Sequence, residues 1–291
     1  MLPSVKNHQS HVEILKQKGL IIDNDETLIF YLSHIGYHRL SEYFKAFQYK
    51  DGAFFPHTNF KQILAVYTFD RKLRLLFLDA IERIEVSFRS MLSYTMCLRT
   101  NDINWLTNIE NFYFRKNTEG TKEKIFEGIQ QKLKQAILYS KEKSMRSFRE
   151  KNPNTFPESG KIFNRLGFGE TSFIFTRLQR RFKESISQHY DIPEERLVSW
   201  MISLSYVRNI CAHHSRLWNK TLDKPFSKNK KFDFKLNHIF AAVCAIITLL
   251  KVISPNSTWK AEFETLIRQH PYIPKNKMGF PHDWELTLSL V

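Results

Sequence analysis

Arginine, asparagine and histidine stand close together in one twelve-residue stretch, R-N-I-C-A-H-H-S-R-L-W-N, which runs from Arg208 to Asn219. Arginine can hold the nonbridging oxygens of a phosphate with a permanent charge. A histidine can remove the proton of a ribose 2′-hydroxyl or donate a proton to the leaving oxygen. These residue types predict phosphodiester cleavage, with Arg208 and His213 as catalytic residues. Asn209 is expected to orient the imidazole or to contact a phosphate.

A helix must position these side chains, and the sequence predicts that it begins near Pro193 and runs through the whole motif. At about 100° of rotation per residue, a polar arc and an apolar arc separate. The polar arc contains Ser205, Arg208, Asn209, His213 and Arg216. The apolar arc contains Leu204, Val207, Ile210, Cys211 and Trp218, and His214 points with it. We therefore expect His213 to face solvent and substrate, and His214 to pack or to make a supporting hydrogen bond.

Two other chemistries fit the motif less well. Adjacent histidines diverge by about 100° on a helix, whereas paired metal ligands usually stand four residues apart, so no metal site is expected. Ser205 and Ser215 lack the turn that presents a nucleophilic serine. The three cysteines, Cys97, Cys211 and Cys244, form no C-x-x-C pair and suggest neither a disulfide framework nor a zinc site. We expect no cofactor and a reducing, cytoplasmic setting.

Composition indicates a folded helical protein with a polyanionic partner. The 291 residues are 42% hydrophobic and contain only 9 Gly and 10 Pro, which together with apolar spacings of three and four predicts an all-α fold. The formal net charge of +15 favours nucleic acid without choosing between RNA and DNA. The most apolar run, residues 239–250, is too short to span a membrane and predicts a core helix. No signal-peptide pattern stands at the N-terminus, so no membrane partner is expected.

Several further helices can be placed by their end signals. The pattern Ser10-x-x-Glu13 resembles a capping box, and Gly19 is placed to end that helix. A second helix is expected after Asn24. Residues 60–98 lack Pro and Gly and predict one long helix. Its charged residues stand three or four apart and predict a solvated or salt-bridged face: Asp70, Arg71, Arg74, Glu82, Arg83, Glu85 and Arg89.

Basic residues outside the motif could follow a phosphate backbone. One group lies in a helical segment expected over residues 121–151, and another lies in the helix after the Gly167-Phe168-Gly169 turn. Ordinary solvation of these side chains is the alternative for both groups. The RNA-binding candidates are Arg177, Arg180, Arg181, Lys183, Lys228, Lys230 and Lys231.

The motif also carries a resemblance to a known family. In its extended form, R-N-x-x-A-H-H-x-R-L-W-N, it resembles the signature of bacterial abortive-infection proteins of the AbiD/AbiF type, within the wider HEPN superfamily of helical ribonucleases. The element Gly36-Tyr37-His38-Arg39-Leu40 with Tyr43 is similar to a G-Y-x-R-L element of that family. Residues 69–74 and 81–85 resemble its central helix. The Phe168-Gly169 turn and the apolar helix after Lys235 also match, so the resemblance spans about residues 10–270.

The resemblance implies an all-α, HEPN-like helical bundle with an additional N-terminal helical subassembly. We expect that subassembly at residues 1–58, the HEPN-like domain at 59–270 with a basic insertion around 115–160, and a C-terminal tail at 271–291. The implied function is a toxin-type endoribonuclease of phage defence or a toxin–antitoxin system. It would cleave RNA without a metal, leaving a 2′,3′-cyclic phosphate and a 5′-hydroxyl. A structured noncoding RNA would restrain it.

The resemblance also implies roles for single residues. Arg208 would stabilise the scissile phosphate, His213 would act as acid or base, and Asn209 would assist. Ser215 stands where simpler HEPN toxins carry a tyrosine, so chemistry that needs that tyrosine is not expected. The supporting candidates are His214, Arg216, Asn219, Glu82 and Glu85.

The copy number of the motif bears on assembly and on the alternative function. HEPN nucleases place two R-x4-H motifs across one cleft, and this sequence holds one, so the resemblance implies a homodimer. The alternative function is an RNA-binding scaffold of a defence ribonucleoprotein, in which cleavage is absent or conditional. The chemistry of the RNA ends would distinguish these two functions.

Overall fold

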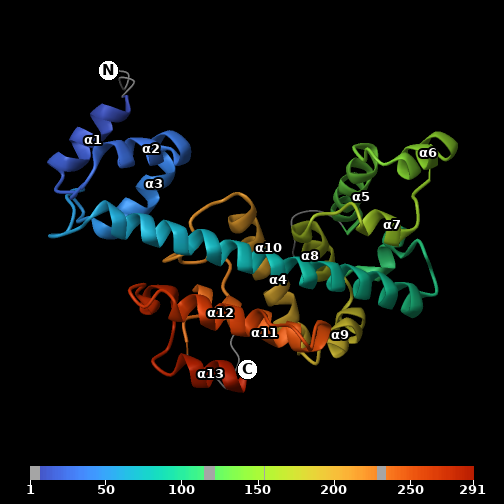
Figure 1. The fold of residues 1–291 in the computed structure, drawn as a ribbon. Coiled ribbons are helices and arrows are strands. Elements are labelled where there is room, and N and C mark those ends of the chain that lie inside the picture. The colour runs from blue at the N-terminus through green and yellow to red at the C-terminus, as the bar shows by residue number, and fades with distance from the viewer. Residues whose placement is uncertain (1–6, 115–121, 154, 228–233) are drawn as a thin grey trace. The chain divides into compact units, whose positions relative to one another are not determined.

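A computed structural model describes residues 7–114, 122–153, 155–227 and 234–291. These residues form thirteen α-helices and no β-strand, apart from isolated bridges, which confirms the all-α prediction (Figure 1). The helices are α1 His8–Gln17, α2 Asp25–Ile35, α3 Tyr37–Phe44, α4 Phe60–Thr100, α5 Lys122–Leu138, α6 Lys143–Lys151, α7 Ser159–Phe163, α8 Phe168–Arg177, α9 Arg180–His189, α10 Glu194–Ala212, α11 Ile239–Ile253, α12 Trp259–Arg268 and α13 Trp284–Leu290.

The chain folds into two compact units that are discontinuous in sequence. Among the described residues, unit 1 holds 7–78, 210–220 and 259–278, and unit 2 holds the rest. Helices α4 and α10 each contribute residues to both units. The domain boundaries expected at residues 58 and 270 remain predictions.

Unit 1 begins with α1, α2 and α3, which group around the N-terminal end of α4 (Figure 1). The capping box at Ser10 was a wrong expectation, because α1 starts earlier and Asn7 caps it by accepting from the amide of Ser10 at 2.8 Å. Gly19 follows the end of this helix with a φ of +89°, as its position in the sequence predicted. Asn24 caps α2. Gly36, at a φ of +88°, makes the sharp turn from α2 into α3.

The long helix predicted over residues 60–98 is confirmed as α4, which extends to Thr100. Its buried stripe follows a spacing of three and four residues. In unit 1 the indole Nε1 of Trp259, on α12, donates to the carbonyl oxygen of Leu76 at 2.7 Å. Leu75 and Val86, both expected on the apolar surface of the helix, are instead 54% exposed.

Unit 2 is built around aromatic contacts and one very apolar helix. The rings of Phe88 on α4 and Phe175 on α8 meet edge to face, 5.1 Å apart. Most side chains of α11 are buried, which confirms the core helix predicted from residues 239–250. No helix in the described part of the chain is long and apolar enough to cross a membrane.

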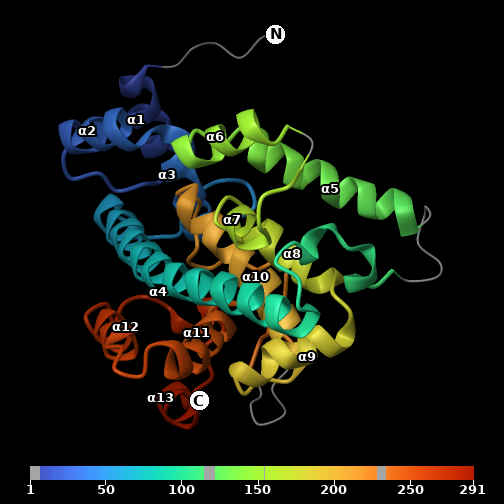
Figure 2. The same cartoon turned by 90° about the vertical axis from the view of Figure 1, so that its right-hand side faces the viewer.

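The basic helical segment expected over residues 121–151 consists of two helices. Figure 2 shows α5 and α6 separated by a short turn, which spans residues 139–142. The guanidinium of Arg149 on α6 bonds the carbonyl oxygens of Ile137 and Leu138 at the end of α5. A cation therefore caps the first helix and holds the second beside it.

Candidate active site

The helix that carries the start of the motif is α10. It begins at Glu194, directly after Pro193, as predicted, but it ends at Ala212. The expectation that the whole motif is helical was therefore wrong from His213 onward. The phasing holds within the helix, where Leu204, Val207 and Cys211 are buried. Ser205 is the exception, because this residue of the expected polar arc is buried.

A closing turn at the end of α10 explains where the two histidines point. The amide of His214 donates to the carbonyl oxygen of Cys211 at 3.1 Å, and the amide of Ser215 donates to that of Ile210 at 3.0 Å. His214 has a φ of +57°. This is the pattern of a Schellman motif, with histidine in the left-handed position that usually takes glycine.

Both histidines are consequently exposed. The exposure expected for His213 is confirmed, whereas the packing expected for His214 was wrong. Helical rotation no longer applies after Ala212, because the chain reverses there.

Arg208 is held by an acidic residue of the long helix. Its Nε lies 3.7 Å from Oε2 of Glu85, and its side chain is 39% exposed. Glu85 is itself buried and also pairs with Arg89, which bonds the carbonyl oxygen of Leu166. Asn209 is exposed, and its Oδ1 accepts from Nη1 of Arg208 at 3.4 Å. Of the two acidic candidates on α4, Glu85 is therefore the one that forms an ion pair with Arg208.

Glu82, the other acidic candidate, is exposed on the surface of α4. It stands three residues before Glu85 on the same helix, so the two acids differ sharply in burial. The ion pair described for Arg208 involves Glu85 and not Glu82.

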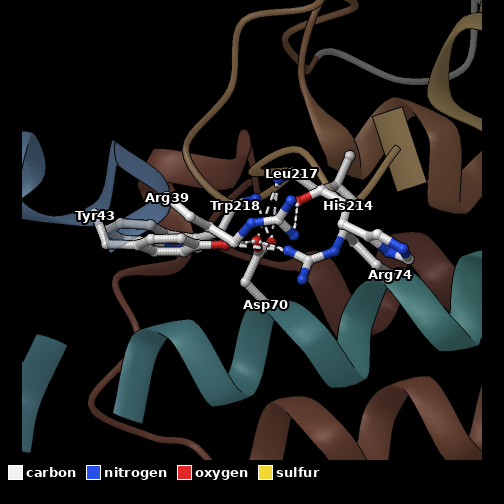
Figure 3. A network of polar contacts seen from close by, with 7 residues as sticks. All are labelled: Arg39, Tyr43, Asp70, Arg74, His214, Leu217 and Trp218. Carbon is white, nitrogen blue, oxygen red and sulfur yellow. Dashed lines mark hydrogen bonds and ion pairs between the residues drawn. The ribbon is translucent and has the colours of Figure 1, made fainter. Parts of the chain in front are cut away.

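The segment that follows the histidines is anchored by a buried carboxylate. Figure 3 shows polar contacts converging on Asp70 of α4. Its carboxylate accepts from the backbone amides of Trp218 at 2.6 Å and Leu217 at 3.2 Å. It also accepts from the hydroxyl of Tyr43 at 2.6 Å, and Arg74 is its ion-pair partner. Asp70 is fully buried and paired with Arg74, so of the two alternatives expected for this face of α4, solvated or salt-bridged, the salt bridge is found here.

The surroundings of Asp70 favour a carboxylate that accepts on every side. Burial is the largest influence on the pKa of Asp70 and raises it, while Arg74, Tyr43 and the two backbone amides act in the opposite direction. All four partners are hydrogen-bond donors. A protonated carboxyl would point its own O–H at one of these donors, whereas an ionised carboxylate accepts from all of them. The same burial raises the pKa of the Tyr43 hydroxyl, which therefore stays a donor.

The sequence contains a signal for this anchor. Asp70 stands in the stripe of buried positions on α4 that includes Ile63, Val66, Leu73 and Phe77. A carboxylate in such a stripe must be paired, because burying it alone is costly. A polar residue at an apolar position therefore predicts a partner from elsewhere in the chain.

A pocket of about 560 Å³ opens beside His213 in unit 1. One wall comes from the start of α3 and the G-Y-H-R-L element, and the other comes from the segment after α10. Arg39 links the two walls by donating from Nη1 to the carbonyl oxygen of His214 at 3.3 Å. The polar and charged residues that line it are Tyr37, His38, Arg39, Glu42, Tyr43, His213, His214, Ser215, Arg216 and Lys220.

The pocket includes two of the supporting candidates, His214 and Arg216, but not Asn219. Asn219 has a φ of +53° and lines another pocket of about 480 Å³ together with Trp218. The walls of this second pocket are mainly apolar, with Phe47 and Val66 among them. The end of the motif therefore faces surroundings unlike those of His213.

The basic candidates of α8 and α9 have partners of their own. The guanidinium of Arg177 lies over the ring of Phe173, and that of Arg181 lies over the ring of Phe182. Arg180 pairs with Glu184 but is 76% exposed. Lys183 is 2.6 Å from a carboxylate oxygen of Glu194, with 16% and 12% of the two side chains exposed.

Lys183 is therefore poorly placed to meet a phosphate, because its charge is already neutralised and mostly buried. Arg180 and Arg181 remain exposed candidates. Lys228, Lys230 and Lys231 lie outside the described residues.

The described residues offer neither a metal-binding cluster nor a thiol with a lowered pKa. Among the described residues, no three His, Cys, Asp or Glu side chains gather in a way that could hold a metal ion. Cys211 and Cys244 are buried free thiols, and burial raises the pKa of each to about 12. These thiols are protonated at neutral pH and are poor nucleophiles.

Comparison with known proteins gives one family. A family model described as Abi-like protein matches residues 30–219. No curated protein and no solved structure matches the chain. The matched region includes the G-Y-H-R-L element, Asp70 and the motif from Arg208 to Asn219.

Proposed function

The chain belongs to the Abi-like protein family, the abortive-infection family of the AbiD/AbiF type, and on that premise we propose that it is an endoribonuclease. The observation that carries the proposal is the pair Arg208 and His213, five residues apart. An ion pair with Glu85 holds the arginine, and the histidine is exposed beside a pocket rich in cations. This is the pairing that cleavage of RNA through its own 2′-hydroxyl requires.

The proposed reaction needs no group beyond protein and RNA. A base removes the proton of the ribose 2′-hydroxyl, and O2′ attacks the adjacent phosphorus. The bond from phosphorus to the 5′-oxygen then breaks, and an acid protonates that oxygen. The products are a 2′,3′-cyclic phosphate and a 5′-hydroxyl. His213 performs one of the two proton transfers, and Arg208 stabilises the charge that grows on the nonbridging oxygens.

A HEPN-type homodimer would supply the second proton transfer. The sequence carries the R-x4-H pattern once, at 208–213, so one chain offers one such histidine. Two copies related by a twofold axis would bring a second Arg208 and His213 to the same cleft. Cleavage should then fall with the square of protein concentration below the dimer dissociation constant, and light scattering after gel filtration should report twice the chain mass.

The test is the chemistry of the RNA ends. Full-length protein is incubated with a labelled RNA in EDTA, and the fragments are examined for 2′,3′-cyclic phosphate and 5′-hydroxyl ends. His213→Ala and Arg208→Ala should each reduce cleavage by about 100-fold or more, with little change in melting temperature, because both side chains reach solvent. His282→Ala, at an exposed histidine outside the motif, is the matched control and should cleave like the wild type. Unchanged cleavage by both motif variants would exclude this assignment.

A second candidate function is RNA binding without cleavage. The cations beside His213 favour it, because they would attract RNA whether or not a proton is transferred. Tight binding of RNA with no new ends in the presence or absence of EDTA would select this function. The proposed partner in either case is a structured noncoding RNA that restrains the protein. Sequencing the RNA that co-purifies from the native locus would identify it.

A further inference from the structure

We propose that the pocket between the G-Y-H-R-L element and residues 213–220 binds an unstacked nucleotide of single-stranded RNA next to the cleaved phosphate. Arg39, Arg216 and Lys220 would hold its phosphates. The proposal rests on the proposed function in taking RNA as the ligand. It adds a role for the N-terminal helices, which the R-x4-H motif alone does not involve.

The charge of the pocket favours an anion. Three basic residues, Arg39, Arg216 and Lys220, line it together with one acid, Glu42. That acid is already paired, because Nζ of Lys45 lies 2.5 Å from its Oε1. The hydrogen bond from Lys45 is the main cause of the lowered pKa of Glu42, and the charges of Arg216 and Lys220 lower it further. Glu42 therefore neutralises little of the positive charge.

Arg216 lines the pocket with a guanidinium that has one unpartnered nitrogen. Its Nε is buried and makes no hydrogen bond to any described residue. Guanidinium groups bind phosphate oxygens with two parallel N–H donors, which suits a phosphodiester.

Arg39 is fixed in place and still has donors to offer. Its described hydrogen bond uses one donor, Nη1, to the carbonyl oxygen of His214, and the side chain is exposed. A guanidinium carries five N–H donors, so binding the backbone leaves others for a ligand. The same contact keeps this charge next to the segment that carries His213.

The size and the rings of the pocket match one nucleotide. Its volume of about 560 Å³ falls in the range of sites for small ligands. Tyr37 and His38 supply rings at the wall, and Tyr37 is steadied by stacking on His11 at 4.3 Å between centroids. Unpaired bases stack on such rings in RNA-binding proteins, whereas duplex RNA keeps its bases inside the helix. The ligand is therefore single-stranded.

Binding to an RNA that cannot be cleaved separates this proposal from the nuclease reaction. The probe is a fluorescent single-stranded RNA whose ribose 2′-oxygens are all methylated, so attack by a 2′-hydroxyl is impossible. Fluorescence anisotropy gives its dissociation constant for full-length protein at several salt concentrations. The pocket variant is Arg39→Gln with Lys220→Gln. The matched control is Arg71→Gln with Lys72→Gln, which removes two exposed charges of unit 1 outside the pocket.

We expect the pocket variant to bind the single strand about 10-fold or more weakly, and to lose about 1.4 from the slope of log affinity against log salt. The control variant should change binding by less than about threefold. With a methylated duplex of the same sequence, the two variants should weaken binding equally. Equal weakening of single-strand binding by both variants would overturn the proposal, because the charges would then attract RNA without forming a specific site.

Folding and catalysis are controlled separately. If the pocket variant has a lowered melting temperature, Lys220→Gln is compared with Lys72→Gln, and equal affinities would overturn the proposal. Cleavage of unmodified RNA by the wild type is measured in parallel. A wild type that never cleaves, combined with the expected loss of binding, would refute the nuclease and retain the pocket. Cleavage by the wild type, combined with no specific loss of binding in the pocket variant, would retain the nuclease and refute the pocket.

Discussion

The two halves of the twelve-residue motif are held in different ways. Arg208 and Asn209 lie on a regular helix, and the side chain of Arg208 is held by one ion pair with Glu85 in unit 2. His213 and the residues after it lie beyond the helix end, and unit 1 holds their backbone through Asp70 and Arg39. The direction of a side chain on a helix follows from the helical repeat. A side chain on an irregular segment depends on whatever fixes that segment, here a buried carboxylate from a position 147 residues earlier in the chain.

This difference predicts that loss of the backbone anchor is the most damaging change. Asp70→Asn removes the countercharge of buried Arg74 and turns an amide donor toward other donors. Breaking a buried ion pair in this way costs about 3–5 kcal/mol of unfolding free energy. Asp79→Asn is the matched control, because Asp79 and Arg83 form an exposed pair with the same spacing on the same helix. That change should cost less than about 1 kcal/mol.

Urea denaturation of the two variants measures both costs. A loss below about 1 kcal/mol for Asp70→Asn would mean that the segment after α10 does not depend on its anchor. The comparison between the two halves of the motif would then fail.

The side-chain anchor in the other half predicts a smaller effect, and one on activity. Glu85→Gln weakens the hold on Arg208 while leaving its charge in place. We expect the specific activity for RNA cleavage to fall about 10-fold, which corresponds to about 1.4 kcal/mol. Glu82→Gln changes an exposed acid one turn earlier on α4 and should leave cleavage unchanged.

Initial rates with saturating and limiting RNA separate positioning from binding. If Glu85 positions Arg208, its replacement lowers kcat more than it raises KM, because Arg208 then stabilises the transition state less well. Equal cleavage by both variants would show that the ion pair of Glu85 is purely structural.

The success of the sequence-based predictions also differs between the two halves of the motif. Periodicity and end signals correctly predicted α4, the start of α10 near Pro193 and the apolar helix α11, since these depend on local patterns. The end of α10 was missed because no glycine marks it, and His214 takes the left-handed position instead. The role of Asp70 was missed because its partners, Leu217 and Trp218, are distant in sequence and contribute only backbone amides.

The reactivity of the cysteine thiols reports on the half of the motif that Asp70 anchors. Burial raises the pKa of Cys211 and Cys244 to about 12, and it also raises the pKa of the half-buried Cys97. A raised pKa makes the thiolate scarce at every pH below it, so reactivity should increase as pH rises toward that value. With Ellman's reagent at pH 8, Cys97 should react first, and the two buried thiols should react only on unfolding.

The reactivity of Cys211 also tests whether Asp70 holds the end of α10 in place. Cys211 lies in the last turn of α10, and the charge of Asp70 contributes to its raised pKa. In Asp70→Asn, Cys211 should become reactive under native conditions while Cys244 stays protected. Equal protection of both thiols in this variant would show that the end of α10 keeps its structure without the anchor.

The smallest expected effect concerns the turn that joins the two halves. His214 has a φ of +57°, a conformation that costs a non-glycine residue roughly 1–2 kcal/mol. His214→Gly relieves this strain, although glycine also gives the unfolded chain more freedom, so the net gain in stability should be below about 1 kcal/mol. His214→Ala keeps the strain and should gain nothing, which makes it the control in thermal unfolding.

Cleavage by the glycine variant then decides what the imidazole of His214 does. If His214 serves only to reverse the chain, His214→Gly should retain RNA cleavage within about threefold of the wild type, because the hydrogen bonds to Cys211 and Ile210 use the backbone alone. A loss approaching that of His213→Ala would place both imidazoles on the substrate. Since both are exposed beside the same pocket, burial does not separate them, and this variant does.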